Sequence, residues 1–238
     1  MFKIFFITFI ILLLIGVPIS ISIGASAVLG CLVLDYPLMV IGQKMVTGVD
    51  SYLLIAIPLF ILAGNLMNAG KITDKIFSFA KELVGWIPGG LGHANIVASI
   101  IFAGMSGSAA ADAGGLGTIE MEAMTKNGYR DNFSGAVTAA SSVIGPIFPP
   151  SIPLIIYGAT ASVSVAKLFM GGVLPGLLMG VALMVLVFIF AVKYRFERHP
   201  FDIIALSKQF FGSILSLINP LIILAGLTSG SFTPTEAS

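Results

Sequence analysis

Long apolar segments, each about as long as a bilayer is thick, constrain this chain more than any other feature. A helix needs roughly 20 apolar residues to cross the hydrocarbon core. Such segments run over residues 51–69, 133–160 and 168–192, and residues 214–227 lie in another. Charged residues make up only 10% of the 238-residue chain, against about 25% in soluble domains. We therefore predict an all-α, multi-pass membrane protein that is surrounded by the lipid bilayer.

The first apolar stretch covers residues 2–34. It starts like a signal peptide, but the apolar run is too long for the core of such a signal, and no cleavage-site pattern follows. We interpret it as retained in the membrane, as one long broken helix or as two short ones. The triplet Gly16-Val17-Pro18 is the expected break, because proline interrupts a helix.

Residues 71–82 have the pattern of a short amphipathic helix. Its apolar side chains are Ile72, Ile76, Phe79 and Leu83, which share one face. We expect this helix to lie along the membrane surface, with its apolar face toward the lipid.

Residues 90–124 predict a re-entrant helical hairpin. Two half-length apolar segments flank a small, polar stretch over residues 106–115. Irregular backbone within a bilayer is tolerated only where it is buried in protein or lines a cavity. The tip residues Ser106, Gly107 and Ser108 are therefore the leading site candidates. The alternative interpretation of such a run is close packing of helices through small residues.

The apolar segment 133–160 is interrupted by a proline-rich stretch. Gly145-Pro146 is followed by Phe148-Pro149-Pro150-Ser151-Ile152-Pro153, and these prolines must break the helix. The alternative for the Pro149-Pro150 pair is a simple kink or a loop at the membrane face. One connecting segment separates the two breaks, so we expect them to meet near the membrane midplane.

Broken helices expose backbone groups that can bind ions. Half-helix N-termini offer N–H groups to anions, and unwound carbonyls coordinate sodium. Serine hydroxyls add oxygen ligands without a fixed charge. We therefore take Ser106, Gly107 and Ser108, with Pro149, Pro150 and Ser151, as candidates for sodium or substrate binding.

Several other polar residues lie in or near these segments. Asp112 is a site candidate because carboxylates within a membrane are often functional, although a capping role for the second half-helix is favoured. Asn65 either bonds across helices or contributes an oxygen to an ion site, and helix packing is favoured. Glu120 and Glu122 are interpreted as solvated carboxylates near the cytoplasmic end.

The placement of Lys and Arg predicts the orientation. The loop with Lys193, Arg195, Arg198 and Lys208 is expected in the cytoplasm, and the hairpin is expected to enter from the same side. The net charge of +1 without a basic stripe excludes a nucleic-acid partner. A single cysteine, Cys31, supports neither a disulfide nor a transition-metal site. We expect no cofactor.

Five sequence words, in order along nearly the whole chain, resemble the large membrane subunit (DctM type) of TRAP transporters, the tripartite ATP-independent periplasmic family. One such word would be a weak signal, whereas five in family order are a strong one. The words are IPLFILAGNLM at 57–67, SGSAAAD at 106–112, FPPSI at 148–152, GGVLPG within 169–176 and GSFTPTEA at 230–237.

The resemblance implies a sodium-coupled importer of an organic acid, such as a C4-dicarboxylate or sialic acid, in the bacterial inner membrane. It implies two partners, a small membrane subunit and a periplasmic substrate-binding protein. It also implies an elevator mechanism with inverted repeats. On that basis residues 1–89 belong to a scaffold, residues 90–165 to the transport domain, and residues 166–238 to helices that lead toward a second repeat.

Chains of this family are about twice as long as this one. The second repeat is expected to be absent, and Thr233, Thr235 and Glu236 belong to the motif with which it begins. We interpret the chain as the N-terminal half of the subunit, either a fragment or a truncated gene product, and expect no transport by it alone.

Three other functions fit parts of the sequence. Another ion-coupled carrier, such as a dicarboxylate–sodium symporter, would also use paired hairpins. A channel or assembly subunit would need no coupling ion. An intramembrane serine protease is suggested by Gly104-Met105-Ser106-Gly107, but a serine nucleophile needs a base, and the two histidines, His93 and His199, lie far from it along the sequence. We therefore expect that the chain is not an enzyme.

Overall fold

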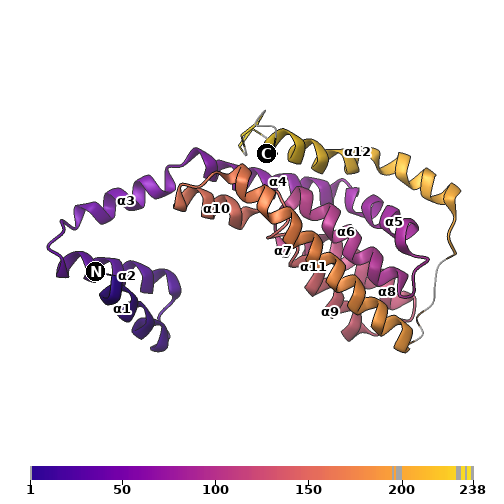
Figure 1. Ribbon diagram of the computed structural model, residues 1–238, viewed down its shortest axis with the longest axis horizontal. Helices are drawn as coiled ribbons and strands as arrows, with labels where there is room; N and C mark the ends of the chain where they lie inside the picture. Colours follow the sequence, from indigo (N-terminus) through magenta and orange to yellow (C-terminus); the bar gives the residue numbers. More distant parts are fainter. Residues whose placement is uncertain (1, 195, 197–199, 229–231, 234, 237–238) are drawn as a thin grey trace. The chain divides into compact units, whose positions relative to one another are not determined.

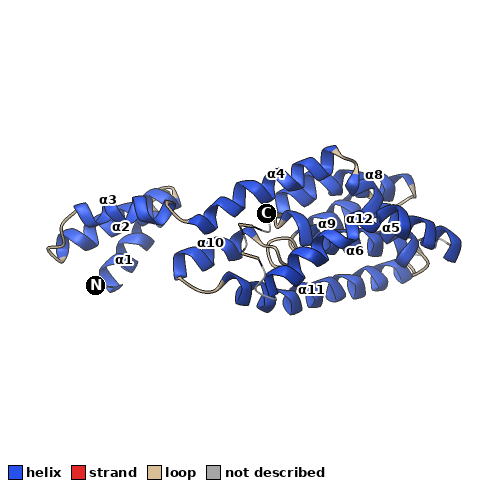
Figure 2. Cartoon of the chain, turned by 90° about the horizontal axis from the view of Figure 1, so that it is seen from above, coloured by secondary structure: helices blue, strands red, loops and turns tan. Residues whose placement is uncertain are grey.

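The computed structural model describes residues 2–194, 196, 200–228, 232–233 and 235–236. Within these residues every regular element is a helix, and no strand is present (Figure 2). This confirms the predicted all-α class. Contacts divide the chain into two units, residues 1–51 and 52–238, each of which is described by itself.

The first unit contains three helices, α1 (Phe2–Leu14), α2 (Ile19–Val33) and α3 (Met39–Val49). The apolar stretch 2–34 thus forms two short helices, of which α1 and α2 pack against each other. Gly16, with a φ of +87°, lies in the break between them, as predicted. Helix α3 lies in a more polar stretch, which the apolar pattern did not mark as a helix.

The second unit starts with the 3-10 turn η1 (Tyr52–Ile55), followed by α4 (Ala56–Ala69), α5 (Ile72–Val84) and α6 (Gly90–Ser106). Helix α6 is the central element, and 14 of its residues are buried. It contacts α4, α5, α8, α9 and α11 (Figure 1). Phe102 and Met105 of α6 belong to the main apolar core.

Helix α5 differs from the expected surface helix. It packs against α6 and α12 instead of lying along the membrane surface. Ile76 and Phe79 are buried against protein and do not face lipid, Leu83 of the same predicted face is exposed, and Phe77 is buried. The apolar spacing identified the helix, whereas its buried face was set by contacts with two neighbouring helices.

The second arm of the predicted hairpin is more regular than its sequence suggests. After Gly107-Ser108 the chain forms α7 (Ala109–Ala111), a π-helical turn η2 (Asp112–Leu116) and α8 (Gly117–Lys126) without interruption. The non-helical tip is therefore limited to residues 107–108, and not the full stretch 106–115. A π-turn inside an α-helix often marks a functional region.

The proline-rich break lies where it was predicted. Helix α9 (Asp131–Ser142) ends before it, and α10 (Ile152–Ala161) begins after it. Helix α11 (Val165–Tyr194) follows, with Pro175 inside it. Helix α12 (Ile203–Thr228) starts 11 residues before the predicted position 214, so Lys208 lies in this helix and not in a loop.

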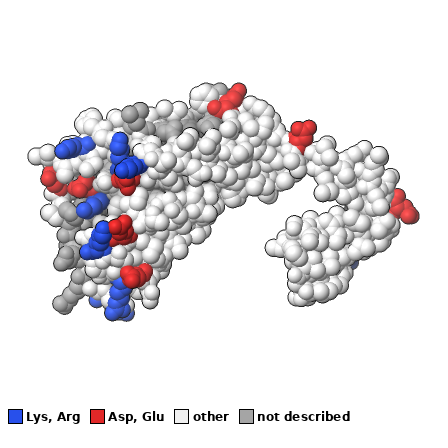
Figure 3. Space-filling view, turned by 180° about the vertical axis from the view of Figure 1, so that it is seen from behind, with Lys and Arg blue, Asp and Glu red and all other residues white. Residues whose placement is uncertain are grey.

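The exposed surface of the second unit is largely apolar. Leu174, Val181 and Ile189 of α11 are exposed, as expected for a helix surrounded by lipid. Among the described residues, two helical stretches, Tyr52–Ala69 and Val165–Tyr194, are long and apolar enough to cross a membrane. On the face seen in Figure 3, the charged side chains of this unit gather mainly at one end.

Candidate functional site

The two predicted breaks meet in the structure. The Ile152 backbone N–H, at the start of α10, donates a hydrogen bond to the Gly107 carbonyl oxygen at 3.4 Å. Gly107 has a φ of +59°, and a Cβ at this position would overlap the Pro150 carbonyl oxygen. The hairpin tip and the proline break therefore touch through their backbones, which only a glycine at position 107 permits.

Ser106 is the last residue of α6 and lies directly at this junction. Its side chain is buried, and its hydroxyl oxygen has no hydrogen-bond partner. Gly64 of α4 packs against it, since a Cβ at Gly64 would lie 3.4 Å from the Ser106 Cβ. A buried hydroxyl without a partner is unusual in folded proteins, so this oxygen is available to a ligand.

The other two predicted serines cap the half-helices that leave the junction. The Ser108 hydroxyl accepts a hydrogen bond from the Ala111 N–H at 3.4 Å, and the Ser151 hydroxyl accepts one from the Leu154 N–H at 3.3 Å. Both residues have extended backbone angles typical of an N-cap. They fix where each half-helix begins.

Asp112 does not cap the half-helix, contrary to the favoured interpretation, because Ser108 already holds that position. Asp112 lies one turn further on, in the π-helical turn, and is 1% exposed. Neither carboxylate oxygen has a hydrogen-bond partner. Ser99 and Ser142 lie beside it, yet their hydroxyls donate to Ser141 and to the Thr138 carbonyl.

Glu120 is the residue that the sequence interpretation missed. It was expected to be solvated, but it is 0% exposed, and both of its carboxylate oxygens lack partners. It is close enough to Asp112 for the two carboxylates to interact electrostatically. Its position two turns after Asp112 was the available signal, because residues 7 or 8 apart share a helix face.

A buried polar network joins α6 to α9 around these carboxylates. The Asn95 side-chain amide donates to the Thr138 hydroxyl at 2.8 Å, and the Ser141 hydroxyl donates to the Asn95 carbonyl oxygen at 2.7 Å. Ser99 donates to Ser141 at 3.1 Å. These side chains are all buried, so the network holds the first hairpin arm against α9.

Replacing Asn95 by alanine is expected to destabilise the fold by about 1–3 kcal/mol, because partners of the lost amide stay buried without it. The free energy of unfolding in detergent measures this effect. Asn65→Ala is the matched control, since Asn65 is exposed on α4 and its loss should change stability little. Equal losses in the two variants would contradict a structural role for the network.

The remaining site candidates are Asn65 on α4 and the motif residues Thr233, Thr235 and Glu236. Asn65 is on an exposed face of α4. The Thr233 hydroxyl and N–H donate to the Glu236 carboxylate at 2.9 and 2.8 Å, the arrangement of a capping box. The Thr235 hydroxyl donates to the Tyr52 carbonyl oxygen at 2.9 Å.

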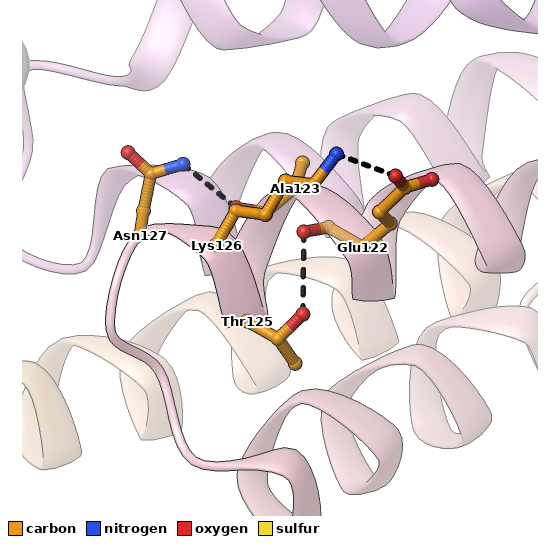
Figure 4. A network of polar contacts seen from close by, with 5 residues as sticks. All are labelled: Glu122, Ala123, Thr125, Lys126 and Asn127. Carbon is orange, nitrogen blue, oxygen red and sulfur yellow. Dashed lines mark hydrogen bonds and ion pairs between the residues drawn. The ribbon is translucent and has the colours of Figure 1, made fainter.

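The C-terminal end of α8 carries exposed polar side chains. Lys126 and Glu122 form an exposed ion pair at 2.6 Å, one helical turn apart, and the Asn127 amide donates to the Ala123 carbonyl oxygen (Figure 4). The hydrogen bond from Lys126 holds the pKa of Glu122, which lies at this exposed end, below its usual value. Glu122 is thus solvated as expected, in contrast to Glu120.

An open cavity of about 500 Å³ lies beside the junction, between α4, α5, α6 and α12. Its lining includes Met67 and Met105, with Lys75 and Ser216 as the polar groups. Among the described residues no cluster of three or more His, Cys, Asp or Glu side chains occurs.

The structure gives no support to a serine protease. His93 and Ser106 lie near opposite ends of α6, and 13 residues of helix separate them by about 20 Å. The His93 Nε2 contacts the Pro88 carbonyl oxygen at 3.1 Å. His199 lies outside the described residues. No histidine among the described residues is thus placed as a base for Ser106.

Comparison with known proteins identifies relatives over nearly the whole chain. The family model for the DctM component of the tripartite ATP-independent periplasmic transporter matches residues 6–238. The sialic acid TRAP transporter large permease protein SiaM of Vibrio cholerae is 50% identical over 200 residues, which cover 82% of this chain and 46% of the relative.

Two further relatives carry the same family name. The sialic acid TRAP transporter permease protein SiaT of Haemophilus influenzae is 45% identical over 96% of this chain and 37% of its own length. The C4-dicarboxylate TRAP transporter large permease protein DctM of Vibrio cholerae is 38% identical over 95% of this chain and 51% of its own length.

These matches establish the class of the protein. The chain belongs to the DctM family of large permease components of TRAP transporters. It spans about half or less of the length of these relatives. The relatives are transporter permeases, which agrees with the expectation that the chain is not an enzyme.

Proposed function

We propose that this chain forms part of a secondary transporter that imports a small organic acid together with sodium ions. The observation that carries the proposal is the contact between two helix breaks, at Gly107 and at Pro150–Ile152, in a buried region of the fold. Such breaks expose the groups that bind coupling ions and anions in transporters with discontinuous helices.

The oxygen atoms at this junction suit sodium, a hard cation. At the junction, Ser106 supplies a buried hydroxyl without a hydrogen-bond partner. Asp112, one turn beyond Ser108, supplies a buried carboxylate without a partner, beside Ser99 and Ser142. The Gly107 carbonyl adds a backbone oxygen from the tip. We assign these groups to sodium binding, with Glu120 as a second carboxylate close to Asp112.

The N-terminus of α10 suits the carboxylate of an organic acid. Ser151 caps this helix by accepting from the Leu154 N–H, and the Ile152 N–H bonds to the Gly107 carbonyl oxygen. The positive end of the helix dipole therefore favours an anion here without a free N–H group. No arginine lies in either break, so the anion would be held by hydroxyl groups and the helix end, or by residues outside this chain.

The proposal extends to the assembly and to its movement. We place the transporter in the bacterial inner membrane, with a small membrane subunit and a periplasmic substrate-binding protein as partners, in keeping with the tripartite family. Residues 90–165 would form the moving, re-entrant part of an elevator, and residues 1–89 the scaffold. Residues 166–238 would lead into a second repeat, which begins with Thr233, Thr235 and Glu236.

The relatives guide the choice of substrate. Two of the most similar ones, SiaM and SiaT, are named as sialic acid transporters, and others are named for C4-dicarboxylate, isethionate and 2,3-diketo-L-gulonate. All these compounds are organic acids. We therefore propose an organic acid as the substrate, with sialic acid as the first compound to test.

The Ser106→Ala variant tests the assignment of the tip hydroxyl. In the full-length permease with its partner proteins, we expect the sodium concentration for half-maximal uptake to rise by about tenfold, the effect of losing roughly 1.4 kcal/mol of ligand binding. The Ser207→Ala variant is the control, because Ser207 is exposed on α12 and bonds only within its helix.

Equal sodium dependence in Ser106→Ala and in the unmodified transporter would remove Ser106 from the ion site.

The channel alternative makes a different prediction. A channel would show uptake that rises linearly with substrate and does not depend on sodium, whereas the proposed carrier saturates and requires the ion.

A further inference from the structure

An open apolar groove of about 230 Å³ lies between α6, α9 and α11 and shares no lining residue with the cavity beside α12. Its lining includes Ile96 of α6, Phe133 and Ala136 of α9, and Leu186 and Phe190 of α11. All of its lining side chains are apolar. The groove therefore fits a hydrocarbon chain and offers nothing to a polar ligand along its length.

Aromatic side chains connect this groove to two cations. The rings of Phe133 and Phe190 meet edge to face at 5.8 Å, and Phe190 stacks with Tyr194 at 6.1 Å. The Arg130 guanidinium lies 5.6 Å from the centre of the Tyr194 ring, and the Lys193 ammonium lies 5.8 Å from it. Both cations are thus gathered over one ring at the end of the groove.

The positive charge of this pair is not neutralised within the described part of the chain. The ion pair there is Lys126 with Glu122, and neither Arg130 nor Lys193 takes part in it. Both side chains are exposed. Two unpaired cations beside an apolar groove form a site with a charged end and a hydrocarbon end, which is the chemistry of an anionic lipid.

We propose that this groove binds an anionic phospholipid, with the phosphate at Arg130 and Lys193 and one acyl chain along Phe133, Ala136 and Phe190. Basic pockets between membrane helices on the cytoplasmic side bind anionic headgroups, and the basic loop after α11 is expected on that side. The inference rests on the membrane setting of the proposed function, but not on its substrate or coupling ion.

Lipid binding to the complete chain, purified in detergent, tests the proposal directly. Native mass spectrometry would compare phosphatidylglycerol with phosphatidylcholine of identical acyl chains. We expect phosphatidylglycerol to bind more tightly than phosphatidylcholine. In the double variant Arg130→Gln/Lys193→Gln, the affinity for phosphatidylglycerol should fall by about 30-fold, because each charge contributes about fivefold. Lys126→Gln, which removes a lysine at the same end of the fold, should bind as the unmodified chain does.

A second variant tests the role of the groove independently of the two charges. Ala136→Phe places a ring in the groove at an exposed position of α9, so it should block the lipid while circular dichroism shows unchanged helix content. Equal binding of the two lipids, unchanged binding in either groove variant, or displacement by soluble glycerol phosphate alone would each overturn the proposal. Transport is not measured, so failure of this inference leaves the proposed function untouched.

Discussion

Gly107→Ala is expected to abolish most sodium-dependent uptake in the full-length transporter. Gly107 has a φ of +59°, and an added Cβ would overlap the Pro150 carbonyl oxygen. The left-handed conformation alone costs a non-glycine residue about 1–2 kcal/mol, and relief of the overlap must move the two breaks apart. We expect at least about a tenfold fall in the uptake rate.

The Gly128→Ala variant isolates the effect of the overlap. Gly128 has a φ of +81°, but a Cβ there would meet nothing within 4 Å. This variant should therefore lose similar stability from backbone strain and keep normal uptake. If Gly128→Ala and Gly107→Ala reduce uptake equally, the contact between the breaks has no special role.

Neutral isosteres of the buried carboxylates are expected to separate stability from transport. Asp112 and Glu120 are 1% and 0% exposed, and none of their carboxylate oxygens has a hydrogen-bond partner. Burying such groups costs free energy, so Glu120→Gln and Asp112→Asn should unfold at the same temperature as the unmodified protein or a higher one. Sodium-dependent uptake should fall by about tenfold or more.

Two further variants sharpen this prediction. The double variant Asp112→Asn/Glu120→Gln should show non-additive stability, because interacting residues couple. Glu122→Gln should change neither quantity, since Glu122 is exposed and paired only with Lys126. If the two carboxylates serve packing alone, Asp112→Asn and Glu120→Gln should keep full sodium-dependent uptake. That result would remove both residues from the proposed ion site.

The break positions were predictable from sequence because proline and glycine act locally. Gly16-Val17-Pro18, Gly107 and Pro149-Pro150 each interrupt a helix at the expected place. The contact between the breaks at Gly107 and at Pro149-Pro150 also followed from sequence, since only one connecting segment separates these two breaks. The start of α12 at Ile203 did not follow, because its first turns mix polar and apolar residues and lack a continuous apolar run.

Other features depend on tertiary contacts that no local pattern records. The glycines at 114 and 115 suggested a loop, yet they lie in a π-turn. A Cβ at Gly115 would overlap the Asn68 side-chain amide, which would have to shift. Glu120 looked solvated because two acidic residues lie close together along α8. The structure turns Glu120 inward and Glu122 outward, and only the packing of α8 against α6 and α9 decides this.

Uptake driven by an imposed sodium gradient tests the central claim most directly. The full-length permease that carries this sequence would be reconstituted in liposomes with its small subunit and its substrate-binding protein, with labelled sialic acid outside. We predict saturable accumulation when sodium is outside, and none when potassium replaces it. Accumulation that is equal with either cation would contradict a sodium-coupled carrier built around the junction of Gly107 and Pro150.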